Sequence, residues 1–215
     1  MREKKKGVYQ KYLKNLLDRL LALVGTAALS WLLLGAGIAV RLDSPGPVLF
    51  RQKRYGFNNE LIEVLKFRSM YVDKCDATAS RLVTKGDPRV TRVGRFIRKT
   101  SLDELPQLFN VLNGSMSIVG PRPERPEIAA QYCEEMPEFS LRLQAKAGLT
   151  GYAQVYGKYN TTPYDKLTMD LMYIAHPSIV EDLKIMFATV KILFMPESTE
   201  GISEGQTTAM SGENH

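Results

Sequence analysis

The sequence predicts a mostly helical α+β protein, in which a membrane-embedded N-terminal helix precedes a small cytosolic domain with a short β-hairpin and interfacial amphipathic helices. Three observations lead to this fold class. Residues 20–40 contain no charged side chain, as expected of a membrane-embedded helix. Short runs typical of strands occur within residues 48–65, around a turn-forming segment. Apolar residues repeat at helical spacing within 105–112 and again within 179–194.

Length and composition limit the possible partners. The 215 residues, 44% of them hydrophobic, suffice for one domain with an appended membrane element. The net charge of +6 favours anionic partners such as lipid headgroups or diphosphates, and no nucleic-acid-binding motif is present, so no nucleic acid is expected. Two cysteines are too few for a disulfide framework and fit a reducing cytosol. Two histidines cannot build a histidine metal site, so any metal should be a hard cation on oxygen ligands.

Residues 1–47 are predicted to form a basic N-terminus and a membrane-embedded helix. As a helix, the uncharged run would be about 31 Å long, close to the ~30 Å core of a bilayer. Basic residues flank it on both sides, which favours keeping both ends in the cytoplasm. We therefore expect a re-entrant helix that enters, breaks and returns, with a single span as the alternative. Ser30 bonding back to a carbonyl, or Gly35 and Gly37, would provide the break.

A β-hairpin and two cations are expected next. Val48–Phe50 and Leu61–Leu65 are predicted to form short strands around a turn at residues 55–59. Lys66 and Arg68 follow with one residue between them, which places both cations on the same side of an extended segment. From the residues alone, a solvated polar edge and a phosphate-contacting pair stay open.

Residues 101–123 are the centre of the chain. They begin with two adjacent carboxylates, Asp103 and Glu104, and end with Arg122 between two prolines. The apolar spacing that follows the acids predicts a helix, and Pro106 is tolerated only in a first turn, so both acids should lie at its N-terminal end. There we expect the helix terminus to offer donors to a phosphate and to keep Asp103 ionised.

Two interpretations of the acidic pair stay open from the residues alone. Ser101 and Glu104 have the S-x-x-E spacing of a capping box, which is a purely structural role. Alternatively, one carboxylate acts as a nucleophile and the other ligates a divalent metal. Arginines at three-residue spacing within 87–99 form a stripe just before the acids, suited to a solvated or lipid-facing surface or to phosphate.

Prolines and apolar spacing organise the rest of the chain. The predicted segments are a mobile connection at 71–86, a connecting helix at 124–146, a broken helix at 165–194 and a disordered tail at 196–215. Pro126 should begin the connecting helix and Pro137 should interrupt it, while His176 and Pro177 should break the later one. The apolar stripe of 179–194 either packs on the domain or lies in the membrane interface.

The motif RKTSLDELPQLFNVLNGSMSIVGPRP at 98–123 resembles that of bacterial sugar transferases, the monotopic polyprenol-phosphate phosphoglycosyl transferases of the small single-domain type. The similarity continues in SPGPVLFRQ, LKFRSM, DPRVTRVGRFIRK and AGLTGYAQV, in the family's order from about residue 11 to 194. The chain departs from the family pattern at Ser30-Trp31, where Ser-Pro is common, and at Ala147 and Tyr152, where the family usually has Pro and Trp.

The resemblance implies a function. It implies that residues 48–195 form a phosphoglycosyl transferase domain at the cytoplasmic face of the bacterial inner membrane. This domain would transfer a sugar 1-phosphate from a nucleoside diphosphate sugar, by family default a UDP-sugar, to undecaprenyl phosphate, and so start a polysaccharide or glycoconjugate. The implied residues are Asp103 as nucleophile of a covalent aspartyl-phosphosugar, Glu104 as Mg²⁺ ligand, Arg98 and Arg122 as catalytic cations, and Lys66, Arg68 and Arg122 as phosphate contacts.

Two other functions stay open beside this one. A membrane-associated, Mg²⁺-dependent diphosphate hydrolase would use the same acids with water as the acceptor. A non-catalytic scaffold that binds anionic lipids would not need Asp103 at all. The sequence also leaves open a homo-oligomer.

Overall fold

A computed structural model describes residues 9, 13–72, 86–157 and 161–193. Most of the predicted mobile connection and all of the predicted tail lie outside these residues. The α-helices are α1 (Lys14–Ala28), α2 (Ser30–Asp43), α3 (Arg92–Lys99), α4 (Gln107–Leu112), α5 (Pro126–Glu135), α6 (Tyr152–Tyr156), α7 (Pro163–Ala175) and α8 (Ile179–Leu193). The strands are β1 (Leu49–Tyr55), β2 (Leu61–Phe67), β3 (Ser117–Val119) and β4 (Gly148–Thr150), and the 3-10 helices are η2 (Phe57–Asn59), η3 (Leu102–Glu104) and η4 (Pro137–Gln144).

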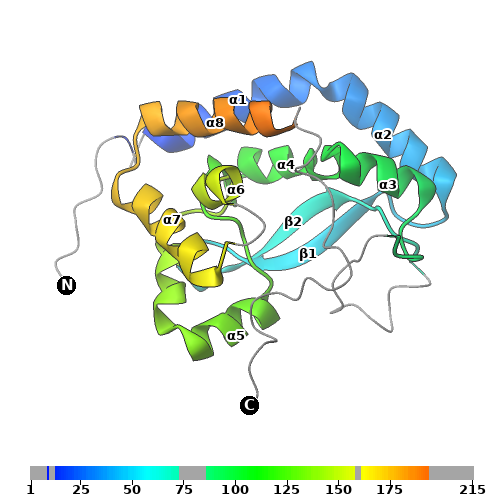
Figure 1. Cartoon of the computed structure of the whole chain (residues 1–215). Coiled ribbons are helices and arrows are strands. Elements are labelled where there is room, and N and C mark those ends of the chain that lie inside the picture. Colours follow the sequence, from blue (N-terminus) through cyan, green and yellow to red (C-terminus); the bar gives the residue numbers. More distant parts are fainter. Residues whose placement is uncertain (1–8, 10–12, 73–85, 158–160, 194–215) are drawn as a thin grey trace, which may run out of the picture.

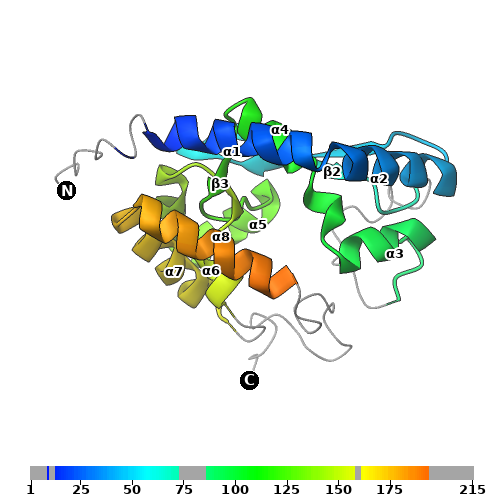
Figure 2. The same cartoon turned by 90° about the horizontal axis from the view of Figure 1, so that it is seen from above.

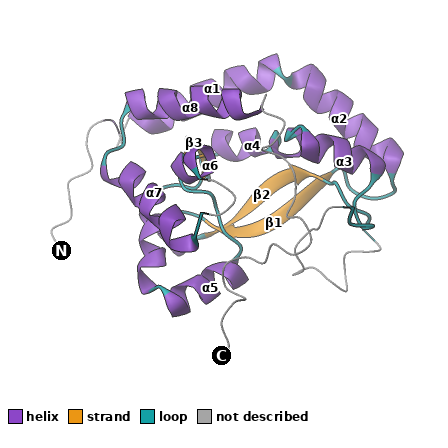
Figure 3. Ribbon diagram, in the orientation of Figure 1, coloured by secondary structure: helices purple, strands orange, loops and turns teal. Residues whose placement is uncertain are grey.

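The helices surround a small sheet, so the predicted α+β class is confirmed. Figure 1 shows α1, α2 and α8 along the upper side of the molecule and α5 along the lower side, with the β1–β2 hairpin between them. Figure 3 shows how much of the described chain is helical. Viewed from above, α8 runs on the other side of β3 from α1 (Figure 2). The Nζ of Lys14 in α1 and the Oδ2 of Asp182 in α8 lie 2.6 Å apart and tie these helices together.

The uncharged N-terminal run bends by 64° between α1 and α2. The break lies at Leu29, and the Ser30 hydroxyl donates to the carbonyl of Ala27 at 2.8 Å, so the predicted break at Ser30 is confirmed. Gly35 and Gly37 lie inside α2 and do not interrupt it. In the described part of the chain no single helix has both the length and the hydropathy for a bilayer crossing, whereas α1 and α2 meet that test as a bent pair.

The predicted hairpin is confirmed, with strands longer than expected. β1 and β2 pair antiparallel, with Leu49 opposite Phe67 and Tyr55 opposite Leu61. Val64 and Phe67 of β2 are both buried, and because they are three residues apart they lie on opposite faces of the strand and join different core clusters. β2 ends at Phe67, so Lys66 belongs to the sheet, and the backbone N–H of Arg68 still donates to the carbonyl of Val48 at 2.9 Å.

A second, very short sheet was not predicted. Ser117 of β3 lies opposite Gly148 of β4, and the two strands run parallel. A Cβ atom built on Gly148 would lie 2.2 Å from the backbone nitrogen of Gly120, and one on Gly151 would lie 2.2 Å from the Gly120 carbonyl oxygen. Glycine is therefore required for the two segments to approach. This close pairing fixes the chain just before Arg122.

The C-terminal half follows the predicted breaks. Pro126 begins α5, Pro137 begins η4, and α7 and α8 separate around Pro177. Most of the apolar stripe on α8 faces outward: the exposed residues are Ile179, Val180, Leu183, Phe187 and Val190. The packed side of α8 is instead formed around fully buried Ile185. These exposed apolar residues of α8 therefore do not pack on the described part of the domain.

The described residues form three core clusters, one of which packs Ala129, Phe139 and Leu167 together. The largest joins α1, α4, β2, β3, α7 and α8, and its buried members are Ala22, Val64, Leu108, Val111, Met116, Ile118, Val119, Ala147, Tyr173 and Ile185. A second cluster packs Ala36 and Val40 of α2 against Phe67 and Ile97. The segment that carries the acidic pair runs between these two clusters, so the fold holds it from both sides.

Candidate active site

The two adjacent carboxylates lie in η3, between α3 and α4. Ser101 precedes them with a φ of 55°, and its side chain makes no capping hydrogen bond, so the capping-box interpretation is wrong. The helix also begins later than predicted, because Pro106 is the N-cap of α4 and not part of its first turn. α4 has six residues and starts beyond both acids, which lie instead in the first turn of η3.

Glu104 is the centre of a cluster of charged side chains. Its Oε1 accepts from the Nζ of Lys66 at 2.6 Å and from the Nη2 of Arg122 at 2.7 Å, while Arg122 Nη1 lies 3.4 Å from Oε2. The exposed side-chain fractions are 21% for Glu104, 17% for Lys66 and 40% for Arg122. Three separate segments thus meet at one carboxylate, and the arginine fork remains partly open to solvent.

The cluster shifts the pKa of each member. Burial by itself raises the pKa of Glu104, but Arg122 and Lys66 outweigh it and hold that pKa well below its usual range. Burial lowers the pKa of Lys66, and Glu104 opposes this shift. The charge of Glu104 is the main cause that raises the pKa of Arg122. Glu104 is therefore ionised whenever the site is folded at neutral pH.

Asp103 has a different environment from its neighbour. Its side chain is half-buried, and within the described residues no hydrogen bond or ion pair occupies its carboxylate oxygens. Burial raises the pKa of Asp103, and Glu104 adds to this, whereas Lys66, Arg98 and Arg122 oppose it. α4 begins four residues beyond Asp103, and the groups that favour the ionised form of its carboxylate are the nearby cations Lys66, Arg98 and Arg122.

Arg98 joins the site from the last turn of α3. Its Nε donates to the Ser69 hydroxyl at 2.7 Å, which holds the side chain beside the end of β2. Its charge acts on Asp103, as noted above, so the structure brings Arg98 to the acidic pair.

Arg68 lies elsewhere. Only 5% of it is exposed, and its guanidinium donates to three carbonyls around the end of α2, those of Ser44 at 2.6 Å, Val40 at 3.3 Å and Pro45. It therefore closes the C-terminal end of α2 and the turn that follows. The phosphate contact suggested for Arg68 gains no support from this geometry, because buried carbonyls already accept hydrogen bonds from its guanidinium.

The backbone around Arg122 is held on both sides by arginines that sequence analysis did not select. Arg54 Nη1 donates to the carbonyl of Pro123 at 2.7 Å, and Arg142 Nη2 donates to the carbonyl of Arg122 at 3.0 Å. Arg142 also pairs with Asp170 of α7 at 2.6 Å, where both side chains are almost fully buried. Among Arg54, Arg142 and Asp170, only Asp170 carries a signal in the sequence, because it is a carboxylate within an apolar helix face.

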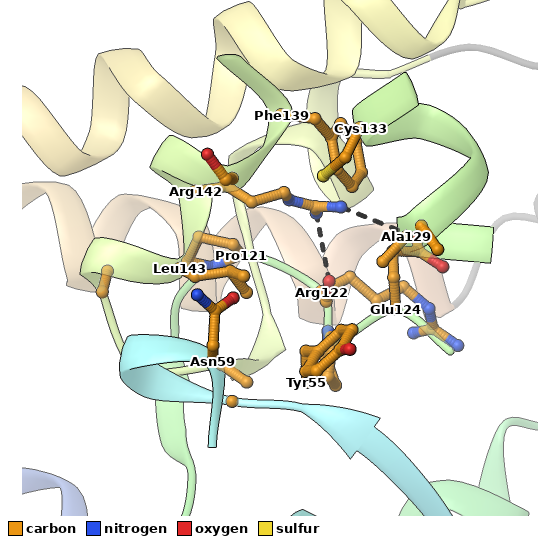
Figure 4. A pocket seen from close by; sticks show the side chains of 16 residues that line it. Tyr55, Asn59, Pro121, Arg122, Glu124, Ala129, Cys133, Phe139, Arg142 and Leu143 are labelled. Carbon is orange, nitrogen blue, oxygen red and sulfur yellow. Dashed lines mark hydrogen bonds and ion pairs between the residues drawn. The ribbon is translucent and has the colours of Figure 1, made fainter. Parts of the chain in front are cut away.

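A cavity of about 340 Å³ borders this backbone on the side of α5 and η4. Figure 4 shows the side chain of Arg142 crossing it toward the Arg122 carbonyl and Glu124, with Tyr55 and Phe139 among the walls. Arg122 thus lines this cavity and also contacts Glu104.

The acidic pair could hold a divalent cation. No group of three or more His, Cys, Asp or Glu side chains gathers within the described residues. Asp103 and Glu104 nevertheless offer adjacent carboxylates, and Mg²⁺ is commonly bound by one or two carboxylates together with substrate phosphates and water. Glu104 Oε2 has only the 3.4 Å contact with Arg122, so this oxygen is the more available one. The donors present thus fit a Mg²⁺ ion shared with a phosphorylated substrate.

Comparison with known proteins identifies the family of this chain. Residues 9–196 match the family model described as bacterial sugar transferase. The undecaprenyl-phosphate glucose phosphotransferase of Komagataeibacter xylinus is 49% identical over 172 residues, which cover 76% of this chain and 32% of that protein. The UDP-glucose:undecaprenyl-phosphate glucose-1-phosphate transferase of Escherichia coli K12 is 46% identical over 183 residues, covering 83% and 39%.

A third relative is closer in length. The exopolysaccharide production protein PSS of Rhizobium leguminosarum is 42% identical over 186 residues, covering 83% of this chain and 93% of that protein. The chain therefore spans less than half the length of the first two relatives and almost the whole of the third.

Proposed function

The chain belongs to the bacterial sugar transferase family, and we propose that it transfers a sugar 1-phosphate from a UDP-sugar to undecaprenyl phosphate, the acceptor in the names of two of its relatives. The main support for the proposal is that the two adjacent acids have different partners. Glu104 is held by Lys66 and Arg122, whereas Asp103 beside it has no such partner within the described residues. One carboxylate is thus fixed in place and the other is available to react.

In the first half-reaction, an Asp103 carboxylate oxygen attacks the phosphorus that carries the sugar. The bond from this phosphorus to the bridging oxygen breaks, and uridine monophosphate leaves with that oxygen. The product on the protein is an acyl phosphate, an aspartyl-phosphosugar. Asp103 must be ionised to attack, and Lys66, Arg98 and Arg122 favour that form against the effect of burial.

In the second half-reaction, a phosphate oxygen of the polyprenol phosphate attacks the same phosphorus. The bond to Asp103 breaks, the carboxylate is restored, and the sugar phosphate is now joined to the lipid through a diphosphate. One product leaves before the second substrate reacts, so the kinetics are ping-pong. No proton has to be moved by the protein if the lipid phosphate is fully ionised.

The cations of the cluster serve two anionic substrates in turn. We assign Arg122, with its partly exposed guanidinium, to the phosphate oxygens on which charge accumulates in the transition state. Lys66 holds Glu104, and Arg98 lies beside Asp103. Mg²⁺, which Glu104 would hold, offsets the negative charge of the donor diphosphate when bound. Among the described residues, these cations are the protein groups that offset the repulsion between the two anionic substrates.

We also propose that α1 and α2 form a re-entrant helix in the bacterial inner membrane, with the active site on the cytoplasmic face. Support comes from the 64° bend between them and from apolar side chains that they expose, such as Trp31 at 70%. Helix α8, which also exposes apolar residues, runs along the same side of the molecule as α1 in Figure 1, and we place it in the membrane interface.

The function is tested by measuring nucleoside monophosphate release from purified protein in lipid nanodiscs. A panel of UDP-sugars with Mg²⁺ is offered with and without undecaprenyl phosphate, starting with UDP-glucose because the E. coli relative is named for it. The proposal requires sustained release that depends on the lipid and disappears in Asp103→Asn. Equal turnover without lipid would identify a hydrolase, and no release with any donor would favour a non-catalytic scaffold.

A further inference from the structure

The backbone of residues 121–124 is bound at four consecutive carbonyls. The donors are, in order, Gly148 N at 2.9 Å, Arg142 Nη2 at 3.0 Å, Arg54 Nη1 at 2.7 Å and Tyr55 N at 3.0 Å. Residues 121 and 123 are prolines, whose rings fix φ and remove a backbone donor. The segment that carries Arg122 is therefore positioned by hydrogen bonds to its carbonyls, and two of these bonds come from arginine side chains.

One of these arginines is anchored by a buried carboxylate. The Nη2 of Arg142, in η4, lies 2.6 Å from the Oδ2 of Asp170, in α7, and the same Nη2 donates to the Arg122 carbonyl. Figure 4 shows this side chain reaching the carbonyl. The N–H donors of a guanidinium form a rigid planar fork, so the direction of one hydrogen bond fixes the direction of the next. Asp170 thereby aims the donor that holds the Arg122 backbone.

The ion pair is almost completely removed from solvent. The exposed side-chain fractions are 6% for Arg142 and 2% for Asp170. Desolvating two charges costs free energy, and hydrophobic residues of similar volume often stabilise a protein as well as a buried ion pair does. Stability alone therefore gives little reason for charges at these two positions. What the pair does provide is a directed hydrogen bond to the Arg122 backbone, which an apolar pair cannot make.

The Arg122 backbone in turn determines where its guanidinium lies. That guanidinium contacts Glu104 at 2.7 Å, and the side chain is 40% exposed, so it can receive a phosphate. Asp170, by contrast, is 1% exposed and cannot touch a substrate. Four groups are thus connected in series: the Asp170 carboxylate, the Arg142 guanidinium, the Arg122 carbonyl and the Arg122 guanidinium beside the acidic pair.

From this series of contacts we infer that Asp170 is a positioning residue for the transfer reaction. Through Arg142 it fixes the backbone of Arg122, and so the place where the Arg122 guanidinium meets the phosphate oxygens in the transition state. The inference rests on the proposed function, which assigns that role to Arg122. It adds a determinant of the reaction rate on α7, outside the segments that carry the acidic pair and its cations.

Asp170→Asn tests the inference, because it keeps the shape of the side chain and removes the charge that aims Arg142. In nanodiscs, we expect it to lower kcat/KM for the UDP-sugar that supports turnover by about 10–10²-fold, the loss expected of a misplaced catalytic group. Asp165→Asn is the matched control on the same helix, since it weakens the capping box with Thr162 at an exposed position. Its kcat/KM should stay within about twofold of the unchanged protein. A normal kcat/KM in Asp170→Asn would overturn the inference.

A double-mutant cycle with Arg122 separates positioning from general damage to the fold. If Asp170 acts through the Arg122 side chain, its substitution has little left to impair once that side chain is gone. In an Arg122→Ala background, we expect Asp170→Asn to slow single-turnover release of nucleoside monophosphate less than about twofold, against at least about tenfold when Arg122 is present. An equal fold-loss in both backgrounds would overturn the inference, since Asp170 would then act independently of Arg122.

A further variant keeps the test valid should the unpaired Arg142 charge unfold Asp170→Asn. Arg142→Met combined with Asp170→Val removes both charges and so leaves no buried ion without its partner. We expect this double variant to melt at a higher temperature than Asp170→Asn, while its kcat/KM stays at least about tenfold low because the Arg122 carbonyl has lost its donor. Recovery of both properties together would overturn the inference, since the pair would then serve stability alone.

Failure of the inference can be told from failure of the proposed function. If the unchanged protein shows no lipid-dependent release with any donor, the proposed function fails and the inference fails with it. If that release is normal and Asp170→Asn matches Asp165→Asn in kcat/KM, the inference alone fails.

Discussion

Arg122 and Glu104 are joined by two contacts, at 2.7 Å and 3.4 Å, although they belong to segments on either side of α4 and β3. The arginine fork therefore lies next to the acidic pair before any substrate arrives. Its backbone is fixed by Arg54 and Arg142, so the position of the guanidinium is built into the fold. The acids of η3 and the guanidinium of Arg122 therefore form one preformed site.

We expect that lysine cannot replace the planar guanidinium of Arg122. We predict that Arg122→Lys and Arg122→Ala both lower kcat/KM for the UDP-sugar by about 10²–10³-fold, because lysine cannot reproduce two parallel hydrogen bonds to phosphate. Steady-state kinetics in nanodiscs give the result. Arg51→Lys, on an exposed pair in the hairpin, is the control and should stay near the unchanged protein. Full activity of Arg122→Lys would show that charge alone suffices.

Glu104 should make stability depend on pH in a defined direction. Its pKa is lowered from an ordinary value of 4.5, so its ion pairs contribute stability that is present above that pH and lost as the pH falls toward the folded-state pKa. Glu104→Gln removes this contribution and leaves two cations without their partner. The difference in melting temperature from the unchanged protein should therefore be large at about pH 7 and shrink as the pH falls below 4.5.

The matched control for this prediction is Glu63→Gln. Glu63 pairs with Arg51 at the surface, and both side chains are more than half exposed, so little stability should depend on it at any pH. A pH-independent loss in Glu104→Gln would mean that shape, and not charge, explains its contribution.

A variant of Arg68 distinguishes a structural role of this residue from a contact with the substrate. Because its guanidinium serves buried carbonyls at the end of α2, we predict that Arg68→Met destabilises the protein by about 2 kcal/mol or more. The KM for the UDP-sugar in the folded fraction should stay unchanged. Thermal unfolding and steady-state kinetics on the same preparation decide the matter, since a raised KM with normal stability would restore the phosphate contact.

Gly148 should be intolerant of any side chain. A Cβ atom there would lie 2.2 Å from the Gly120 nitrogen and 2.5 Å from its carbonyl oxygen, so Gly148→Ala must force β3 and β4 apart. We predict a loss of at least about 3 kcal/mol in unfolding free energy, together with lower activity because Arg122 follows this sheet. Gly35→Ala, at an open helical position, should be neutral or slightly stabilising. Equal behaviour of the two variants would contradict the close approach.

Elements with local causes were predictable from the sequence. The hairpin, the breaks near Pro126, Pro137 and Pro177, and the bend at Ser30 all follow from residues at the element itself. The acidic pair, Lys66, Arg98 and Arg122 were all selected as candidate site residues, and the structure brings them together.

What escaped prediction depends on contacts between distant segments. The β3–β4 pair involves strands of three residues each, too short to give a periodic pattern. The Arg142–Asp170 pair joins two helical segments 28 residues apart. The role of Arg68 depends on the carbonyls of Val40, Ser44 and Pro45, which belong to a segment more than 20 residues earlier in the chain.

The proposed mechanism depends on a covalent intermediate on Asp103. We predict that Asp103→Asn, which cannot form it, remains folded. Burial raises the pKa of Asp103, so its ionised form costs stability above that pKa, and Asp103→Asn should be at least as stable as the unchanged protein at neutral pH. A loss of reaction in this variant can then be assigned to chemistry.

The most direct measurement is intact-protein and peptide mass spectrometry after mixing the protein with its UDP-sugar and Mg²⁺ in nanodiscs free of polyprenol phosphate. The account predicts one sugar phosphate bound to the peptide that contains Asp103, absent in Asp103→Asn and released when undecaprenyl phosphate is added. Lipid-dependent turnover without any such adduct, or an adduct that persists in Asp103→Asn, would contradict it.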